Sequence, residues 1–361
     1  MGIEGSVVIG ISMKTILAQL SGWGVLLLGV LPSCLGWDYE GHRLVNQAAV
    51  SLLPSNFPGF VQTAEARERI AFLAGEPDRW RNTPDLPLRH CNGPDHYFDV
   101  DDLVLYKLEP MALSHFRYEF AGQLAVARAT KPEQFPTIDP TQDRDRTKTQ
   151  IGFLPWAITE QYSKLKSGFS YLKAYEQAGT PEEIANARQN ILYIMGVMGH
   201  YVGDLTQPLH TTKNYNGWVG ENPAGYTTSK GFHAWIDGGF LQKSGMVTLT
   251  ELRPKLRPAR SLWDGQPLEK RPDVFPEVMA MLLKQFKLVE PLYRMDKEGK
   301  LSAKDETGRV GREFLTGQLA VAAQMLSDLW FTAWDQSLPD TYLLGHLAKR
   351  KLAAPDAPKQ P

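Results

Sequence analysis

The sequence predicts an all-α fold, a single mainly helical domain with long loops. Apolar residues recur at helical spacing in many segments, and few segments show the sustained alternation of a β-strand. The 361 residues contain no internal repeat and no convincing linker in the middle. With 43% hydrophobic and 22% charged residues, the composition is that of a globular protein with enough chain for a large core.

Apolar residues at the 3.6-residue period predict the helices. The expected helices are residues 44–52, 60–74, 111–129, 155–177, 181–205, 274–290 and 308–335. Residues 37–43, before the first of these helices, are expected to be irregular. Residues 75–102 are rich in Pro, Gly and Asp and are expected to be a loop. Residues 137–150 are expected to be a solvated connection, and residues 214–231 another long loop.

The two ends of the chain are expected to lie outside the domain, which we place at residues 37–345. Residues 346–361 are expected to be a disordered tail, because the last part has no apolar face. Residues 13–36 show a secretory signal pattern of a lysine, an apolar core and small residues at the end. Met13 is a better initiator than Met1, which would make residues 1–12 an upstream extension.

Residues 1–36 are therefore interpreted as a signal peptide that is cleaved near Gly36, which makes Trp37 the new N-terminus. The protein is then expected to be secreted or periplasmic. An uncleaved membrane anchor and a lipid attached at Cys34 are the alternatives. After cleavage only Cys91 remains, so the mature chain would have no internal disulfide.

The stretch HYVGDLTQPLH, His200–His210, carries the strongest chemical signal. Its helix is expected to begin at Pro181, which two glutamates follow. If the helix runs to residue 205, His200 and Asp204 project from one face. Pro208 then ends the helix and leaves His210 beyond it. This arrangement is typical of a zinc scaffold; the alternative is a buried, hydrogen-bonded histidine beside an exposed Asp–His pair.

Further His and Asp residues lie in loops or at helix ends. The whole candidate set is His42, Asp78, His96, His200, Asp204, His210, His233 and Asp237. His233 and Asp237 repeat the four-residue spacing of the central pair. Taken singly, each residue is more often a capping Asp or a surface His. Together, five His and three Asp suit zinc better than calcium or magnesium.

These motifs resemble the zinc-dependent phospholipase C and single-strand nuclease superfamily, whose nuclease branch includes the mung-bean-type secreted nucleases. The resemblance runs from Trp37 to Asp237 and is most specific in HYVGDLTQPLH. It implies a mainly helical fold around three zinc ions per chain.

The resemblance also implies how the ligands are divided. Asp78, His96, His200 and Asp204 would hold the first zinc; His210, His233 and Asp237 would hold the second. The amino group and carbonyl of Trp37, with His42 and a bridging Asp204, would hold the third. The third site requires removal of the signal peptide, which would link secretion to activity.

The nuclease branch is favoured by the short spacing from Trp37 to His42, by Asp rather than Glu at 237, and by the 23 residues from His210 to His233. The lack of disulfides and the long insertion between His96 and His200 keep the phospholipase branch open.

We expect a monomeric hydrolase of single-stranded DNA or RNA, without a stable protein partner. A phospholipase C acting on phospholipid head groups and a non-enzymatic zinc-binding protein are the alternatives. The net charge of −1 excludes only nucleic-acid binding that depends on a high overall positive charge.

The expected reaction is phosphodiester hydrolysis by a zinc-activated hydroxide. Asp78 is the candidate that orients this water or accepts its proton. Arg81 resembles the family's basic residue and would bind a phosphoryl oxygen, or else be a solvated loop arginine. Tyr215, Trp218 and Tyr226 would stack bases, receive acyl chains or a choline group, or simply pack their loop.

Overall fold

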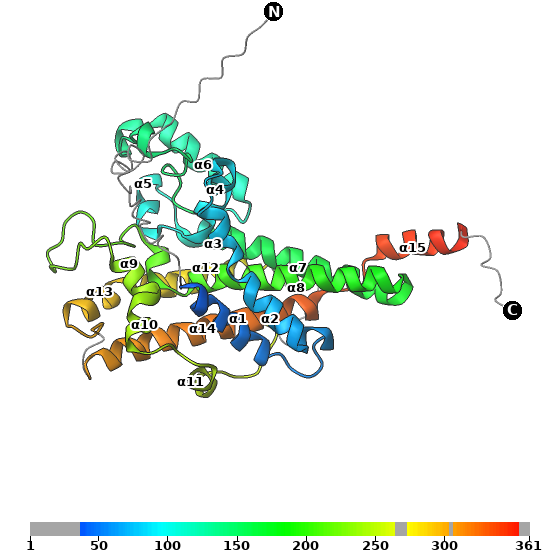
Figure 1. The fold of residues 1–361 in the computed structure, drawn as a ribbon. Helices are drawn as coiled ribbons and strands as arrows, with labels where there is room; N and C mark the ends of the chain where they lie inside the picture. Colours follow the sequence, from blue (N-terminus) through cyan, green and yellow to red (C-terminus); the bar gives the residue numbers. More distant parts are fainter. Residues whose placement is uncertain (1–36, 264–272, 303–305, 354–361) are drawn as a thin grey trace, which may run out of the picture. The chain divides into compact units, whose positions relative to one another are not determined.

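The computed structural model describes residues 37–263, 273–302 and 306–353, which are all-α as the sequence predicts (Figure 1). Within these ranges there is no β-strand, only an isolated bridge between Phe98 and Gly152. They belong to one compact unit. None of their helices is long and apolar enough to cross a bilayer. The predicted signal peptide, residues 1–36, lies outside the described residues.

The helices are named in chain order. They are α1 (Tyr39–Ser51), α2 (Ala64–Leu73), α3 (Glu76–Arg81), α4 (Leu86–Asn92), α5 (Leu103–Tyr106), α6 (Arg117–Thr130), α7 (Leu154–Ala178), α8 (Pro181–Leu205), α9 (Phe232–Ala234), α10 (Phe240–Ser244), α11 (Leu249–Leu252), α12 (Phe275–Phe286), α13 (Val289–Lys297), α14 (Gly308–Gln336) and α15 (Thr341–Ala353). Short 3-10 turns connect several of them.

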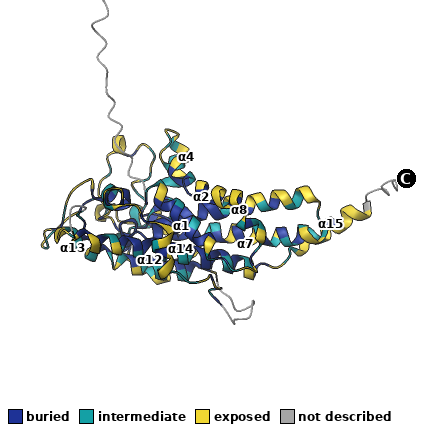
Figure 2. Ribbon diagram, turned by 60° about the horizontal axis from the view of Figure 1, so that its bottom comes forward, coloured by how far each residue is buried: buried dark blue, intermediate teal, exposed yellow. Residues whose placement is uncertain are grey.

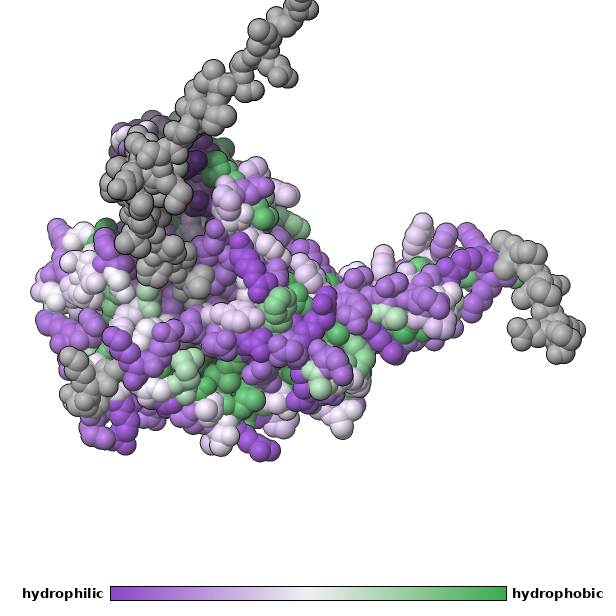
Figure 3. Space-filling view, viewed as in Figure 1, coloured by the Kyte–Doolittle hydropathy of each residue, from purple (hydrophilic) through white to green (hydrophobic). Residues whose placement is uncertain are grey.

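Helix α8 is central to the packing. It begins at the predicted Pro181, where Thr180 and Glu183 form a reciprocal capping box. It lies along α7 and also packs against α1, α2 and α14. Every residue from Met195 to Leu205 is buried, so the half that carries the central motif lies inside the core. Figure 2 shows buried residues where α1, α7 and α14 run close together, and Figure 3 shows a largely hydrophilic outer face.

Two glycines of α8 let α1 approach closely. A Cβ atom at Gly199 would overlap the side-chain amide of Asn46, and one at Gly203 would lie 2.6 Å from Nδ1 of His42. The absence of a side chain at these positions allows α1 to bury His42 against α8. Asn46 strengthens the contact, because its Nδ2 donates to backbone carbonyls of α2 and α8.

Residues 75–102 are not the loop that the sequence predicts. They form α3, α4 and two 3-10 turns, Gly93–His96 and Val100–Asp102. Three of the four prolines that suggest a loop stand in the first turns of α3, α4 and Gly93–His96, where a missing N–H costs no hydrogen bond; the fourth, Pro84, precedes the α4 cap residue Asp85. A series of short helix starts and a loop therefore have similar compositions here.

Other boundaries also differ. Helix α1 begins at Tyr39, earlier than expected, because the Asp38 side chain accepts from the N–H of Gly41. The expected helix 274–290 ends at Phe286, and α13 follows. The prediction of a disordered tail over 346–361 is wrong for residues 346–353, which belong to α15. This helix buries Leu347 and packs on α7. Residues 354–361 lie outside the described residues.

The connections at 137–150 and 214–231 are confirmed. The first is mostly exposed and contains only one 3-10 turn, Pro140–Gln142. The second contains no helix. It links the end of the central motif to α9, so it lies between two of the candidate histidines.

Candidate metal centre

The structure gathers the eight candidate side chains into three buried groups. In each group the donor atoms lie within 4.8 Å of one another. The groups are His42, Asp78 and His200; His96, His200 and Asp204; and His210, His233 and Asp237. Each group can hold a metal ion. The third is the set that the resemblance implies for the second zinc, and the first two share His200.

Asp204 lies at the centre. Its Oδ1 is 3.5 Å from Nε2 of His42 and 3.6 Å from Nδ1 of His210. Its Oδ2 is 3.0 Å from Nδ1 of His96 and 3.2 Å from Nε2 of His200. One carboxylate therefore faces histidines of all three groups.

Asp78 and Arg81 enter from α3, one helical turn apart. Oδ1 of Asp78 lies 3.8 Å from Nε2 of His200 and 3.9 Å from Nδ1 of His96. The same oxygen accepts a 2.7 Å hydrogen bond from Nε of Arg81. The Arg81 side chain is only 16% exposed. It is therefore not a solvated loop arginine, and its charge lies beside the His/Asp groups.

Backbone carbonyls orient two of the histidines. Nδ1 of His200 lies 2.7 Å from the carbonyl of Ala74, and Nδ1 of His210 lies 2.6 Å from the carbonyl of His96. A carbonyl can only accept, so each Nδ1 carries the proton and each Nε2 keeps its lone pair. A second hydrogen bond of this kind is what metal-binding histidines normally make.

Several buried polar atoms of the candidate ligands have no hydrogen-bond partner in the described part of the chain. They are both ring nitrogens of His42, Nε2 of His96, Oδ1 of Asp204, Nε2 of His210, Nδ1 of His233 and Oδ2 of Asp237. Buried polar groups are nearly always paired, since an unpaired one costs about 1–3 kcal/mol. Cations bound in the three groups would give buried imidazole and carboxylate atoms of this kind a partner, so the donor set fits metal binding.

Burial controls the charge of the histidines. It lowers the pKa of His42, and it lowers the pKa of His96 to about 3. Burial also favours neutral His200, but the carboxylates of Asp204 and Asp78 outweigh it and raise the pKa of that imidazole. Metal binding uses the neutral form of this imidazole.

The two central carboxylates stay ionised. Burial would raise the pKa of Asp78, but the Arg81 charge and the neighbouring histidines lower it overall. Burial opposes the ionised form of Asp204 as well, yet His210 and His200 hold its pKa well below the usual value. Neutral imidazoles and ionised carboxylates are the forms that bind metal.

Trp37 packs against the half of α8 that carries the central motif. It is fully buried, and its Nε1 donates a 3.0 Å hydrogen bond to the carbonyl of Gly203. The N–H of Asp38 donates to the carbonyl of Asp237 at 3.0 Å. The start of the predicted mature chain is therefore fixed between the Asp204 and Asp237 groups.

The aromatic residues of the 214–231 loop have different roles. Trp218 and Tyr226 pack against each other and against Tyr293, so they stabilise the loop. Tyr215 is half exposed, and its ring meets the His233 ring edge-on at 5.6 Å. Only Tyr215 of the three lies against a candidate ligand.

Two buried polar residues of this region were missed by the sequence analysis. Asn46 joins three helices, and Gln207 contacts Asp237. Neither has a spacing that would single it out, although Gln207 lies within the central motif. His90, His115 and His346 belong to none of the three groups.

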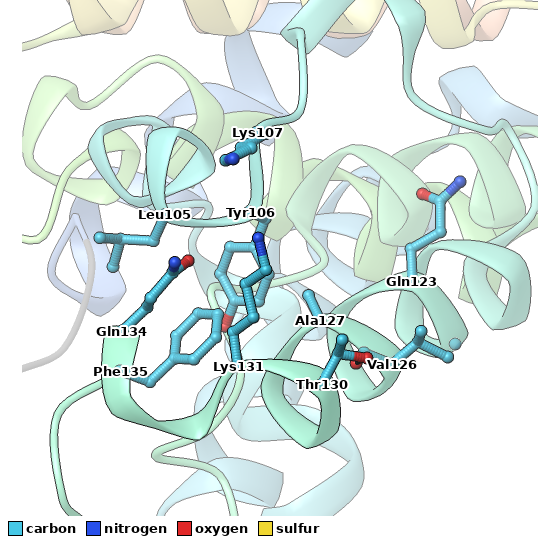
Figure 4. Close-up of a pocket in the computed structure, with 11 residues that line it drawn as sticks. Leu105, Tyr106, Lys107, Gln123, Val126, Ala127, Thr130, Lys131, Gln134 and Phe135 are labelled. Carbon is cyan, nitrogen blue, oxygen red and sulfur yellow. Dashed lines mark hydrogen bonds between the residues drawn. The ribbon is translucent and has the colours of Figure 1, made fainter.

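A groove of about 560 Å³ between α5 and α6 is separate from this centre (Figure 4). Leu105, Val126 and Phe135 give it an apolar lining, and Lys107 and Lys131 are its charged residues. It contains none of the candidate ligands.

No model of a known protein family matches the chain, and no match was found among curated proteins.

Proposed function

We propose that this protein is a secreted or periplasmic zinc-dependent phosphodiesterase that cleaves single-stranded DNA or RNA. The supporting observation is the gathering of buried imidazoles and carboxylates into three groups around Asp204, next to the guanidinium of Arg81. Five imidazoles with three carboxylates suit zinc, whereas calcium and magnesium prefer oxygen ligands. The resemblance to the zinc-dependent phospholipase C and nuclease superfamily supplies the reaction class.

We assign three zinc ions to this centre. Asp78, His96, His200 and Asp204 would hold the first, and His210, His233 and Asp237 the second. The terminal amino group and carbonyl of Trp37, with His42 and Asp204, would hold the third. The closeness of Asp204 to both His42 and His200 supports its place in two of these sets.

Zinc supplies Lewis acidity, which makes water a nucleophile near neutral pH and offsets negative charge on phosphate oxygens. Asp78 accepts a hydrogen bond from the attacking water and so orients it. Arg81 binds a phosphoryl oxygen and stabilises the charge that builds on it in the transition state. The hydrogen bond from Arg81 to Asp78 holds these two side chains in one fixed arrangement.

Nucleic acid is favoured over phospholipid by Tyr215. Its half-exposed ring beside His233 offers a flat face on which a base of a flexible single strand can stack. A phospholipase C acting on head groups is the second candidate, and a zinc-binding protein without turnover is the third. We propose a monomer without a stable protein partner.

The first test is hydrolysis by protein that begins at Trp37. Single-stranded RNA and DNA are expected to release nucleotides, a zinc chelator is expected to stop the release, and added zinc to restore it. Phosphatidylcholine vesicles, assayed for diacylglycerol, are the comparison. Diacylglycerol without nucleotides would identify a phospholipase. Zinc-loaded protein that hydrolyses neither substrate would leave a non-enzymatic zinc protein.

A second prediction concerns the N-terminus. A chain that keeps Gly36 before Trp37 is expected to bind two zinc ions instead of three and to lose most turnover, because its Trp37 nitrogen is an amide. Metal analysis of the two purified chains measures the difference. Trp37→Phe in the chain that begins at residue 37 is the control, since it loses the indole bond to Gly203 but keeps the amino group. Equal zinc content with and without Gly36 would contradict the prediction.

A further inference from the structure

Gln207 is a fully buried residue just beyond the end of α8 that contacts both sides of the metal centre. Its backbone N–H donates to the carbonyl of Asp204 at 3.0 Å, and its carbonyl accepts from the N–H of His210 at 3.0 Å. Its side chain reaches Asp237, which lies 30 residues further along the chain, and donates from Nε2 to Oδ1. A single residue therefore joins members of two proposed zinc sites.

The orientation of the Gln207 amide is fixed by the backbone. Its Oε1 accepts a 2.6 Å hydrogen bond from the N–H of Leu209. Because an N–H can only donate, the oxygen of the amide must face Leu209, and the NH₂ group must face Asp237. The amide cannot rotate without losing both hydrogen bonds.

This amide determines which oxygen of Asp237 is available. Oδ1 is occupied by Gln207, whereas Oδ2 is buried and faces Nε2 of His233 at 2.7 Å. Rotation of the Asp237 carboxylate would break the bond to Gln207. The carboxylate is therefore held with Oδ2 directed to the histidines.

We propose that Gln207 is a positioning residue of the His210/His233/Asp237 site. It holds Oδ2 of Asp237 as the ligand atom, and its backbone sets the separation between His210 and Asp204. This inference rests on the proposed function, since zinc is the cation considered. Loss of a residue that orients a metal ligand typically costs about 10–100-fold in metal affinity.

Two substitutions separate this role from a purely structural one. Gln207→Glu keeps an acceptor for Leu209 but replaces the donor that faces Asp237 with a second carboxylate. Gln207→Met keeps the chain length and removes both hydrogen bonds. If Gln207 acts on Asp237, both variants are expected to bind one of the three zinc ions about 10–100-fold more weakly. The other two ions should be retained.

The measurement is zinc affinity, by competition with a chromophoric chelator, together with the absorption spectrum of the cobalt-substituted protein. Gln336→Met is the matched control, because Gln336 is a buried glutamine of α14 that accepts from Tyr162 and belongs to none of the His/Asp groups. Circular dichroism verifies that each variant folds.

The outcomes are distinct. Wild-type protein that binds no zinc would overturn the proposed function itself. Wild-type protein that binds zinc, with Gln207→Glu equal to it in affinity and cobalt spectrum, would overturn the inference alone. In that case, weaker binding by Gln207→Met would show that the residue only supports the turn at Leu209.

Discussion

His200→Ala is expected to abolish hydrolysis and to lower the zinc content of the protein. His200 belongs to two of the three groups, and its Nε2 lies 3.0 Å from Nδ1 of His96 and 3.2 Å from Oδ2 of Asp204. Substitutions that only disturb the orientation of a ligand cost about 10–100-fold in metal affinity or activity. Removal of a ligand itself should cost more, so we expect kcat/KM to fall by more than about 100-fold.

Steady-state hydrolysis of single-stranded RNA and metal analysis of the same sample measure this effect. His346→Ala is the control, because His346 is exposed on α15 and belongs to none of the groups. Because His200 lies in the buried half of α8, misfolding of His200→Ala would also abolish activity. A second variant is therefore needed. His210→Ala changes a residue outside that helix and should remove zinc from the His233/Asp237 site. Full zinc and normal turnover in both variants would disprove the ligand assignment.

The central helix could be predicted from local sequence because each signal agreed. The proline and glutamates at the start of α8, and the apolar residues at helical spacing within it, all indicate one long helix. Residues 75–102 could not be predicted this way. Helices α3 and α4 have only six and seven residues, too few to establish a period, and proline occurs both in loops and in first helical turns.

In the metal centre too, some contacts follow from local sequence spacing and others depend on tertiary packing. The four-residue spacing of His200 and Asp204 places both on one face of α8, as predicted. His233 and Asp237 also meet, although the chain between them passes into the π-helical turn Trp235–Gly239 rather than continuing as an α-helix. Local spacing was sufficient for these pairs.

The meeting of His42 with Asp204 depends on tertiary packing. The glycines of α8 that admit α1 give no sign in the sequence of which residue will lie against them. The expected grouping of distant ligands came from the resemblance to a family. The role of Gln207 could not be predicted from the sequence, because it depends on a contact with Asp237 that exists only in the folded chain.

Arg81→Ala is expected to lower kcat/KM by about 100–1,000-fold, the usual cost of removing a group that stabilises developing charge. Zinc content measured with excess zinc present should stay unchanged, because Arg81 is not itself a ligand. The kcat/KM of Arg81→Lys should lie between those of Arg81→Ala and the wild type. Lysine keeps the positive charge but loses the planar fork that matches two phosphate oxygens. Steady-state kinetics and metal analysis of each variant provide the measurement.

Arg79→Ala is the matched control for Arg81→Ala. Arg79 lies in the same short helix, but its side chain is 47% exposed and pairs with Glu76. Since a surface ion pair contributes little, Arg79→Ala should leave kcat/KM unchanged. If Arg81→Ala loses zinc in proportion to activity, then Arg81 acts by holding Asp78 in place, and its assignment to the phosphate is wrong. Loss of activity with full zinc supports contact with the substrate, because the ligand geometry is then intact.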